Sequence, residues 1–120
     1  MVYRLRVEST FDAAHKLVGF VGKCSNLHGH TWKAEIFVVG SDLDKIGMLV
    51  DFGLLKEKLR ETTDKLDHSF LNDFDKIGNP TSENIAKYIF QNLKDLPKNV
   101  ILEKVRVWES SQSWSEYFEN

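Results

Sequence analysis

Apolar and polar residues alternate at the beginning of the chain. Apolar side chains occupy every second position from Tyr3 to Val7, with Arg residues between them. This pattern is typical of a strand with one solvent-facing side, and it predicts a strand over about residues 2–12. The β-rich run HTWKAEIFVVG, which ends at Gly40, predicts a second strand. We expect the two strands to pair antiparallel through the loop at 13–29.

Two later segments have apolar residues at helical spacing. The segment at 53–68 has leucines at this spacing, and Asp51 before it is a candidate N-cap. The segment at 79–93 has a second apolar stripe, and Thr81 is its candidate cap. Residues 101–118 predict two further strands, which are joined by the polar stretch SSQS.

The resulting order of elements, ββααββ, predicts the α+β class. We expect an antiparallel sheet of four strands with both helices on one face. Such a sheet has two open edges, and small domains often cover open edges by pairing with another subunit. We therefore expect a homo-oligomer with sites near the seams between its subunits.

Length and composition agree with one folded domain. The chain has 120 residues, of which 42% are hydrophobic, so we expect a single domain over 1–120 with its own core. Sixteen basic and eighteen acidic residues give a net charge of -2 without long runs of either sign. This distribution indicates neither a nucleic-acid partner nor a membrane surface. There is no apolar run of about 18 residues and no signal-peptide pattern, so we expect a cytoplasmic protein.

Three of the four histidines are candidate metal ligands. His28 and His30 are two residues apart, so an extended chain points both imidazoles to the same side. His15 lies at the end of the first predicted strand, where the antiparallel partner brings it near the other two. Three imidazoles around one point form an open zinc site, in which the fourth position is free for water or substrate. The alternative is a turn with surface histidines.

Cys24 is the single cysteine and cannot form an intrachain disulfide, which leaves three roles for it. It lies four residues before His28 and could complete a closed, structural zinc site. If the thiol stands away from the metal, nearby positive charge favours the thiolate, which is a base or a nucleophile. The third possibility is an inert buried thiol.

Acidic residues at two places are candidates for other roles. Asp67 precedes the fourth histidine, His68, and an Asp that orients an imidazole can form a proton shuttle. On a surface loop the same pair has no function. Glu109 shares a strand face with Val105 and Val107, so a carboxylate continues an otherwise buried row. It is either the exposed end of the strand or a group that binds the N–H groups of a heterocycle.

Six short motifs together resemble one enzyme family. They are, in chain order, FDAAH at 11–15, CSNLHGH at 24–30, VDF at 50–52, LDH at 66–68, NPTSEN at 79–84 and WES at 108–110. Over about four fifths of the chain they resemble the 6-pyruvoyl-tetrahydropterin synthase and 6-carboxy-tetrahydropterin synthase family. The resemblance implies a tunnelling fold (T-fold), in which the sheets of three ββααββ subunits form a barrel and two barrels stack as a hexamer.

The resemblance also implies a substrate, 7,8-dihydroneopterin triphosphate, and roles for the residues around HGH. By position, His15, His28 and His30 correspond to the family's zinc ligands, and Cys24 corresponds to its catalytic thiol. Animal enzymes that form the pyruvoyl product usually have a longer spacing between the cysteine and HGH than the carboxy-forming branch. The stretch SNL gives this chain three residues there, which favours 6-carboxytetrahydropterin synthase of queuosine and 7-deazaguanine synthesis. A pyruvoyl-forming synthase or a related side-chain lyase is the alternative.

The resemblance further implies that Asp67 and His68 form the proton-relay pair, which in the family acts from a neighbouring subunit. Glu109 corresponds to the residue that anchors the pterin. The chain departs from the family pattern at Ser110, where threonine is common, and in its tail, which affects the fine contacts around the pterin.

Two more distant alternatives belong to other functional classes. A three-histidine zinc hydrolase would tolerate the loss of Cys24 and would not need Glu109. A non-catalytic zinc module would use Cys24 as its fourth ligand and would unfold on zinc removal.

Overall fold

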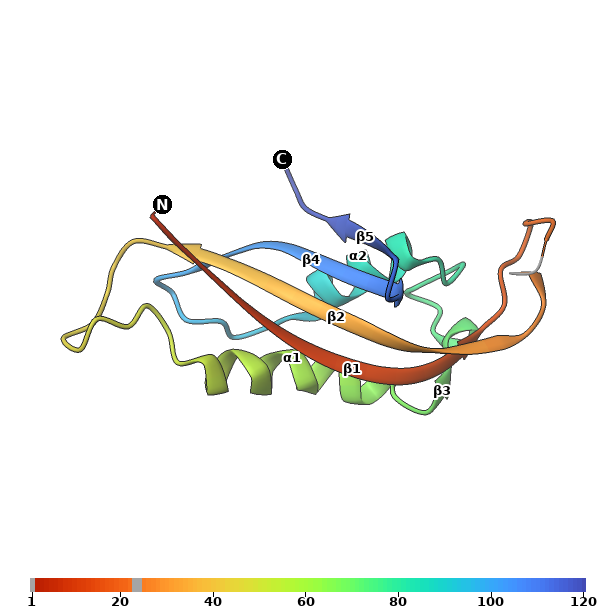
Figure 1. Ribbon diagram of the computed structural model, residues 1–120, viewed down its shortest axis with the longest axis horizontal. Coiled ribbons are helices and arrows are strands. Elements are labelled where there is room, and N and C mark those ends of the chain that lie inside the picture. The colour runs from red at the N-terminus through yellow and green to blue at the C-terminus, as the bar shows by residue number, and fades with distance from the viewer. Residues whose placement is uncertain (1, 23–24) are drawn as a thin grey trace.

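The computed structural model describes residues 2–22 and 25–120. Its elements follow the predicted order (Figure 1). They are β1 (Tyr3–His15), β2 (His28–Gly40), α1 (Phe52–Leu66), β3 (Ser69–Phe70), the 3-10 turn η2 (Leu71–Asp73), α2 (Ser82–Asn92), β4 (Ile101–Ser110) and β5 (Ser113–Tyr117). The ββααββ order expected from the sequence is therefore confirmed for the described residues, with one short addition, β3.

The strands form one sheet in the order β3-β1-β2-β4-β5. The four long strands pair antiparallel, as expected, and the β1–β2 pair extends without interruption from Tyr3 opposite Gly40 to His15 opposite His28. The sheet differs from the expected four-stranded one because β3 pairs parallel with β1 at Ala13 and Ala14. A strand of two residues is too short to produce an alternating pattern, so the sequence could not reveal it.

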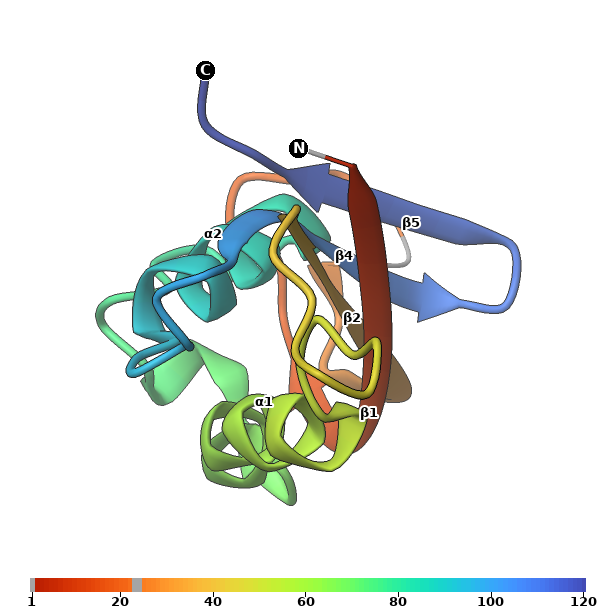
Figure 2. The same ribbon diagram turned by 90° about the vertical axis from the view of Figure 1, so that its left-hand side faces the viewer.

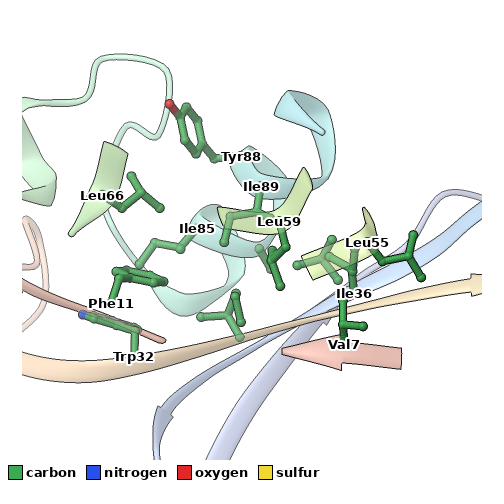
Figure 3. Close-up of a cluster of buried hydrophobic side chains, with 14 of the residues drawn as sticks. Val7, Phe11, Trp32, Ile36, Leu55, Leu59, Leu66, Ile85, Tyr88 and Ile89 are labelled. Atoms are coloured by element: carbon green, nitrogen blue, oxygen red, sulfur yellow. The ribbon is translucent and has the colours of Figure 1, made fainter. Parts of the chain in front are cut away.

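Both helices cover the same face of the sheet (Figure 2). Alternate residues of β1 and β2 point to this face, and Val7 lies opposite Ile36 and Phe11 opposite Trp32 in the register. They pack against Leu55, Leu59 and Leu66 of α1 and Ile85, Tyr88 and Ile89 of α2 (Figure 3). Most of the apolar side chains that the sequence patterns predicted as buried thus form one cluster between the helices and the sheet, whereas Tyr3 at the start of β1 is 44% exposed.

Side-chain caps begin both helices at the expected residues. The carboxylate of Asp51 accepts a hydrogen bond from the Gly53 N–H at 3.0 Å at the start of α1. The hydroxyl of Thr81 accepts one from the Asn84 N–H at 3.1 Å at the start of α2. Each cap satisfies a backbone donor that the helix itself leaves unpaired.

The molecule is elongated, with extents of 53 × 27 × 26 Å. The first strand is longer than the predicted 2–12 and reaches His15, so β1 and β2 extend past α1 at one end (Figure 1). This end carries the three candidate metal ligands. Neither helix of the described chain combines the length and the apolar composition that crossing a membrane requires.

Candidate metal centre

Three imidazoles converge where the β1–β2 pair ends. His15 lies directly opposite His28, and His30 lies two residues further along β2. The ring centroids are 4.5 Å apart for His15 and His28, 4.7 Å for His28 and His30, and 5.2 Å for His15 and His30. One ring nitrogen from each histidine lies within 4.8 Å of the other two. Strand alternation therefore places the three side chains on one side, as predicted.

Backbone carbonyls fix the orientation of two of these rings. His15 Nδ1 lies 2.8 Å from the Pro80 carbonyl oxygen, and His28 Nδ1 lies 2.6 Å from that of Asn26. A carbonyl oxygen only accepts hydrogen bonds, so each Nδ1 carries the proton, and in the neutral ring each Nε2 has a free lone pair. The two Nε2 atoms are 2.9 Å apart. Two lone pairs repel at this distance, whereas a cation held by both removes the conflict.

The third imidazole leaves a buried nitrogen without a partner. His30 Nε2 is buried and makes no hydrogen bond within the described residues. Burial is the main cause that lowers the pKa of His30, so its neutral form, which binds metals, is favoured. Three neutral imidazoles with convergent lone pairs suit a zinc ion that keeps one open position. The residues present therefore fit the metal that the sequence predicts.

Trp32 forms the floor of this histidine cluster. It is fully buried, and its ring centroid lies 4.9 Å from that of His15 and 5.1 Å from that of His30, edge to face in both cases. Its indole N–H donates to the Ala13 carbonyl at 3.1 Å, which fixes the ring. The sequence pattern predicts Trp32 only as part of the second strand, without a role at the site. Its position two residues after His30 places it on the same strand face, and this spacing could have indicated its contact with the histidines.

Glu109 reaches the edge of the histidine cluster from β4. Its carboxylate oxygens lie 3.9 Å from His15 Nε2 and 4.0 Å from His30 Nε2, which is too far for a hydrogen bond. Its side chain is 30% exposed, whereas Val105 and Val107 before it are fully buried. The predicted shared face is thus observed, but the buried row ends in a half-exposed carboxylate. A bulge against β5 interrupts the strand pairing between Trp108 and Ser110, on either side of Glu109.

Asp67 and His68 form a separate group just after α1. His68 Nδ1 lies 2.9 Å from the Asp67 carboxylate, and the Asp12 backbone N–H donates to that carboxylate at 2.8 Å. The hydrogen bond from the Asp12 backbone is the main cause that lowers the pKa of Asp67, and His68 adds to it, so Asp67 stays ionised. His68 has a positive φ of 55°, a conformation that non-glycine residues rarely adopt and that is common at functional sites.

An open surface depression of about 420 Å³ lies beside both groups. Its lining comes from the ends of β1 and β2 and from the chain after α1: Asp12, Ala13, Ala14, Gly29, His30, Thr31, His68 and Ser69. His30 and His68 both border this depression, whereas His15, His28 and Asp67 do not, and the Asp67–His68 pair lies outside the histidine cluster. Cys24 lies outside the described residues, so its predicted role has no structural counterpart here.

Known proteins resemble this chain over nearly its whole length. The family described as 6-pyruvoyl tetrahydropterin synthase matches residues 4–120. A 6-carboxy-5,6,7,8-tetrahydropterin synthase of Haemophilus influenzae is 34% identical over 98% of this chain and 100% of its own length. A dihydroneopterin monophosphate aldolase of Pyrococcus furiosus is 36% identical over 93% of this chain and 94% of its own.

A solved structure also resembles this chain over nearly its whole length. The 6-pyruvoyl tetrahydropterin synthase of Caenorhabditis elegans superposes with a TM-score of 0.84 at 28% identity, over 98% of this chain and 96% of its own. This likeness and the observed element order confirm the predicted α+β subunit of the T-fold. The chain belongs to the 6-pyruvoyl tetrahydropterin synthase family.

Proposed function

We propose that the protein is a zinc-dependent 6-carboxy-5,6,7,8-tetrahydropterin synthase. It converts 7,8-dihydroneopterin triphosphate and water into 6-carboxytetrahydropterin, acetaldehyde and triphosphate. The observation that carries the proposal is the convergence of three imidazole nitrogens beside the carboxylate of Glu109. The relatives that bear this enzyme name, at 34% to 39% identity, support the choice of reaction.

In this proposal His15, His28 and His30 hold the zinc ion through one nitrogen each. The carbonyl partners of His15 and His28 keep the Nδ1 protons in place and so direct Nε2 toward the metal. The bound ion supplies Lewis acidity, which stabilises negative charge on the side-chain oxygens of the substrate. The protein supplies the rigid β1–β2 platform and the buried Trp32 floor, which hold the ligands in their arrangement.

The proton transfers are assigned to Cys24, Asp67 and His68. Cys24, as thiolate, removes the proton from the side-chain carbon next to the ring. Asp67 accepts a hydrogen bond from His68 and orients its imidazole, which exchanges protons with the substrate hydroxyls. Loss of triphosphate and retro-aldol cleavage then release acetaldehyde. The low pKa of Asp67 supports its role as the ionised partner of the imidazole.

Glu109 is assigned to the pterin ring. Its two carboxylate oxygens lack a hydrogen-bond partner in the described chain and stand beside the metal centre. A pterin presents a ring N–H and an amino group side by side, and an ionised carboxylate can accept from both. This contact orients the side chain of the substrate toward the histidines.

The assembly and the pathway are part of the proposal. We expect a trimer or hexamer with active sites at subunit interfaces, since β5 and most of β1 are open sheet edges in the single chain. His68, whose side chain is 80% exposed, is accessible to a neighbouring subunit. We assign the product to queuosine and 7-deazaguanine synthesis.

One experiment distinguishes this function from its nearest rival. The zinc-loaded protein is incubated separately with 7,8-dihydroneopterin triphosphate and with dihydroneopterin monophosphate, and the pterin and aldehyde products are identified. Acetaldehyde with 6-carboxytetrahydropterin supports the proposal, and 6-pyruvoyltetrahydropterin indicates the sister synthase. Cleavage of the monophosphate alone indicates an aldolase, a candidate that the relative from Pyrococcus furiosus favours.

A further inference from the structure

Two asparagine side chains hold the backbone just after His15. Asn72 accepts from the Lys16 N–H at 2.9 Å and donates to the Lys16 carbonyl at 2.7 Å. Asn79 accepts from the Val18 N–H at 2.9 Å and donates to the Val18 carbonyl at 3.0 Å. The backbone fixes the orientation of both amides, because its N–H must face Oδ1 and its carbonyl must face Nδ2.

These two amides continue the edge of β1 beyond the end of β3. The last pairing of β3 joins Phe70 to Ala14. Lys16 and Val18 follow at intervals of two residues, and in an extended chain such residues present their backbone groups to the same side. Asn72 and Asn79 thus replace a neighbouring strand along this edge, although they come from η2 and from the turn before α2.

The contacts of Asn72 with Lys16 and of Asn79 with Val18 form an asparagine clamp on the backbone after His15. The NPTSEN motif links this clamp to the metal centre. The Asn84 amide donates to the Asn79 carbonyl at 2.8 Å, and Thr81 caps α2, so both ends of the motif are fixed to the helix. Between them, the Pro80 carbonyl binds His15 Nδ1. One short turn therefore sets the ring of a proposed metal ligand and the path of the chain three residues later.

We infer that Asn72 and Asn79 are positioning residues of the active site. They fix the direction in which the chain leaves His15, and with it the start of the segment that leads to Cys24. The inference rests on the proposed function, in which the Cys24 thiol performs catalysis. It assigns a role to Asn72 of the LND stretch and to Asn79 of the NPTSEN stretch through their backbone contacts.

The clamp itself is tested by hydrogen exchange on Asn72→Leu and Asn79→Leu, which keep the side-chain size and remove both hydrogen bonds. We expect exchange to accelerate roughly tenfold at Lys16 in the first variant and at Val18 in the second. Asn79→Asp retains an acceptor for the Val18 N–H and should keep that amide protected. Asn99→Leu is the matched control, because the Asn99 amide holds the Asp42 and Leu49 carbonyls at the other end of the sheet.

The consequence for the active site is measured on the single thiol of the chain. The zinc-loaded parent, both leucine variants and the Asn99 control are alkylated with iodoacetamide, and zinc content, kcat and KM are determined. We expect a several-fold change in alkylation rate and a lower kcat in the leucine variants, with zinc content and KM retained. The Asn99 control should match the parent. If Asn79→Leu does not fold, Asn79→Asp takes its place, because it still loses the hydrogen bond to the Val18 carbonyl, and a smaller change in alkylation rate is expected.

Alkylation at the parent's rate in variants whose Lys16 or Val18 amide exchanges rapidly would overturn the inference. So would an equal change in the Asn99 control, because the effect would then reflect general stability. Alkylation needs no substrate, so this test stands even if the parent does not convert dihydroneopterin triphosphate. A failure of the inferred clamp and a failure of the proposed function are therefore separate results.

Discussion

The indole N–H of Trp108 donates a hydrogen bond to the carboxylate of Glu35 on the neighbouring strand. Glu35 is only 2% exposed, on the sheet face opposite the helices, and Arg6 binds its other oxygen. Arg106 lies 3.9 Å away. Burial by itself raises the pKa of Glu35, but the indole and the guanidinium groups outweigh it and hold the pKa below its ordinary value. The network thus stabilises the ionised carboxylate.

This network predicts an acid-sensitive part of the stability. Because the pKa of Glu35 is depressed by folding, its contribution is complete above the ordinary Glu pKa of about 4.3 and is lost as the pH falls through the lower folded pKa. Glu35→Gln should unfold more easily at pH 7, by ~1–3 kcal/mol, because the indole and arginine lose their charged partner. Below about pH 4.3, the free energy of unfolding of this variant should also change less with pH than that of the parent.

Urea unfolding between pH 3 and pH 7 measures both effects. Glu103→Gln is the control, because Glu103 pairs with Arg4 at 2.7 Å on the exposed edge of the same sheet face, where ion pairs contribute little. If the free energy of unfolding falls equally in the two variants, the burial of Glu35 does not make its ion pairs more stabilising than an exposed one.

The parts of the site that depend on strand alternation could be predicted from the sequence. The two-residue period places His28 and His30 on one side, and the antiparallel pairing brings His15 to them. The contacts of Asn72 and Asn79 could not be predicted, because they join loops far apart in the chain. No local pattern determines which backbone group a side-chain amide meets.

The exposure of Glu109 shows the same limit. Alternation correctly gives it the face of Val107, but its position at the strand end and the neighbouring bulge leave it half exposed. Bulges depend on how two strands pair, so the sequence of each strand alone indicates them only weakly. Elements and faces thus follow from periodicity, whereas the fine geometry of the site follows from tertiary contacts.

The histidine cluster predicts that His28→Ala loses its metal. The purified parent should carry about one zinc ion per chain, because within the described residues the three histidines form one convergent nitrogen cluster. Removing His28 leaves two ligands, which bind zinc too weakly to retain it through dialysis. Elemental analysis measures the content, and His68→Ala, outside the cluster, should keep the parent value. Full zinc retention in His28→Ala would remove the metal assignment.

The catalytic role proposed for Cys24 predicts a variant that binds zinc and does not turn over. Cys24→Ala should keep its zinc, since three imidazoles suffice to hold the ion. Turnover should fall by ~10² to 10⁴, the usual effect of removing a general base. Zinc content and product formation are measured on the same preparation. If zinc leaves together with the thiol, a closed structural site explains the histidines better.

The anchoring role proposed for Glu109 predicts a loss of pterin affinity without a loss of metal. Glu109→Gln keeps the shape of the side chain, but one end of its amide is a donor and cannot accept from the pterin. Because the carboxylate is half exposed, we expect a loss of ~1.5–3 kcal/mol, the range for a hydrogen bond to a charged group. Zinc content should not change, since the carboxylate stands 3.9 Å from the nearest imidazole nitrogen.

Titration calorimetry with a non-reactive pterin measures this difference. The expected loss of binding free energy corresponds to a roughly ten- to hundredfold larger dissociation constant. Glu103→Gln is the matched control, because Glu103 pairs with Arg4 at 2.7 Å, near the end of β1 opposite His15. Both substitutions remove one negative charge, so a general electrostatic effect would weaken binding equally in the two variants. Only a direct contact weakens it in Glu109→Gln alone, and equal affinity in parent and variant would mean that Glu109 is merely the end of a strand.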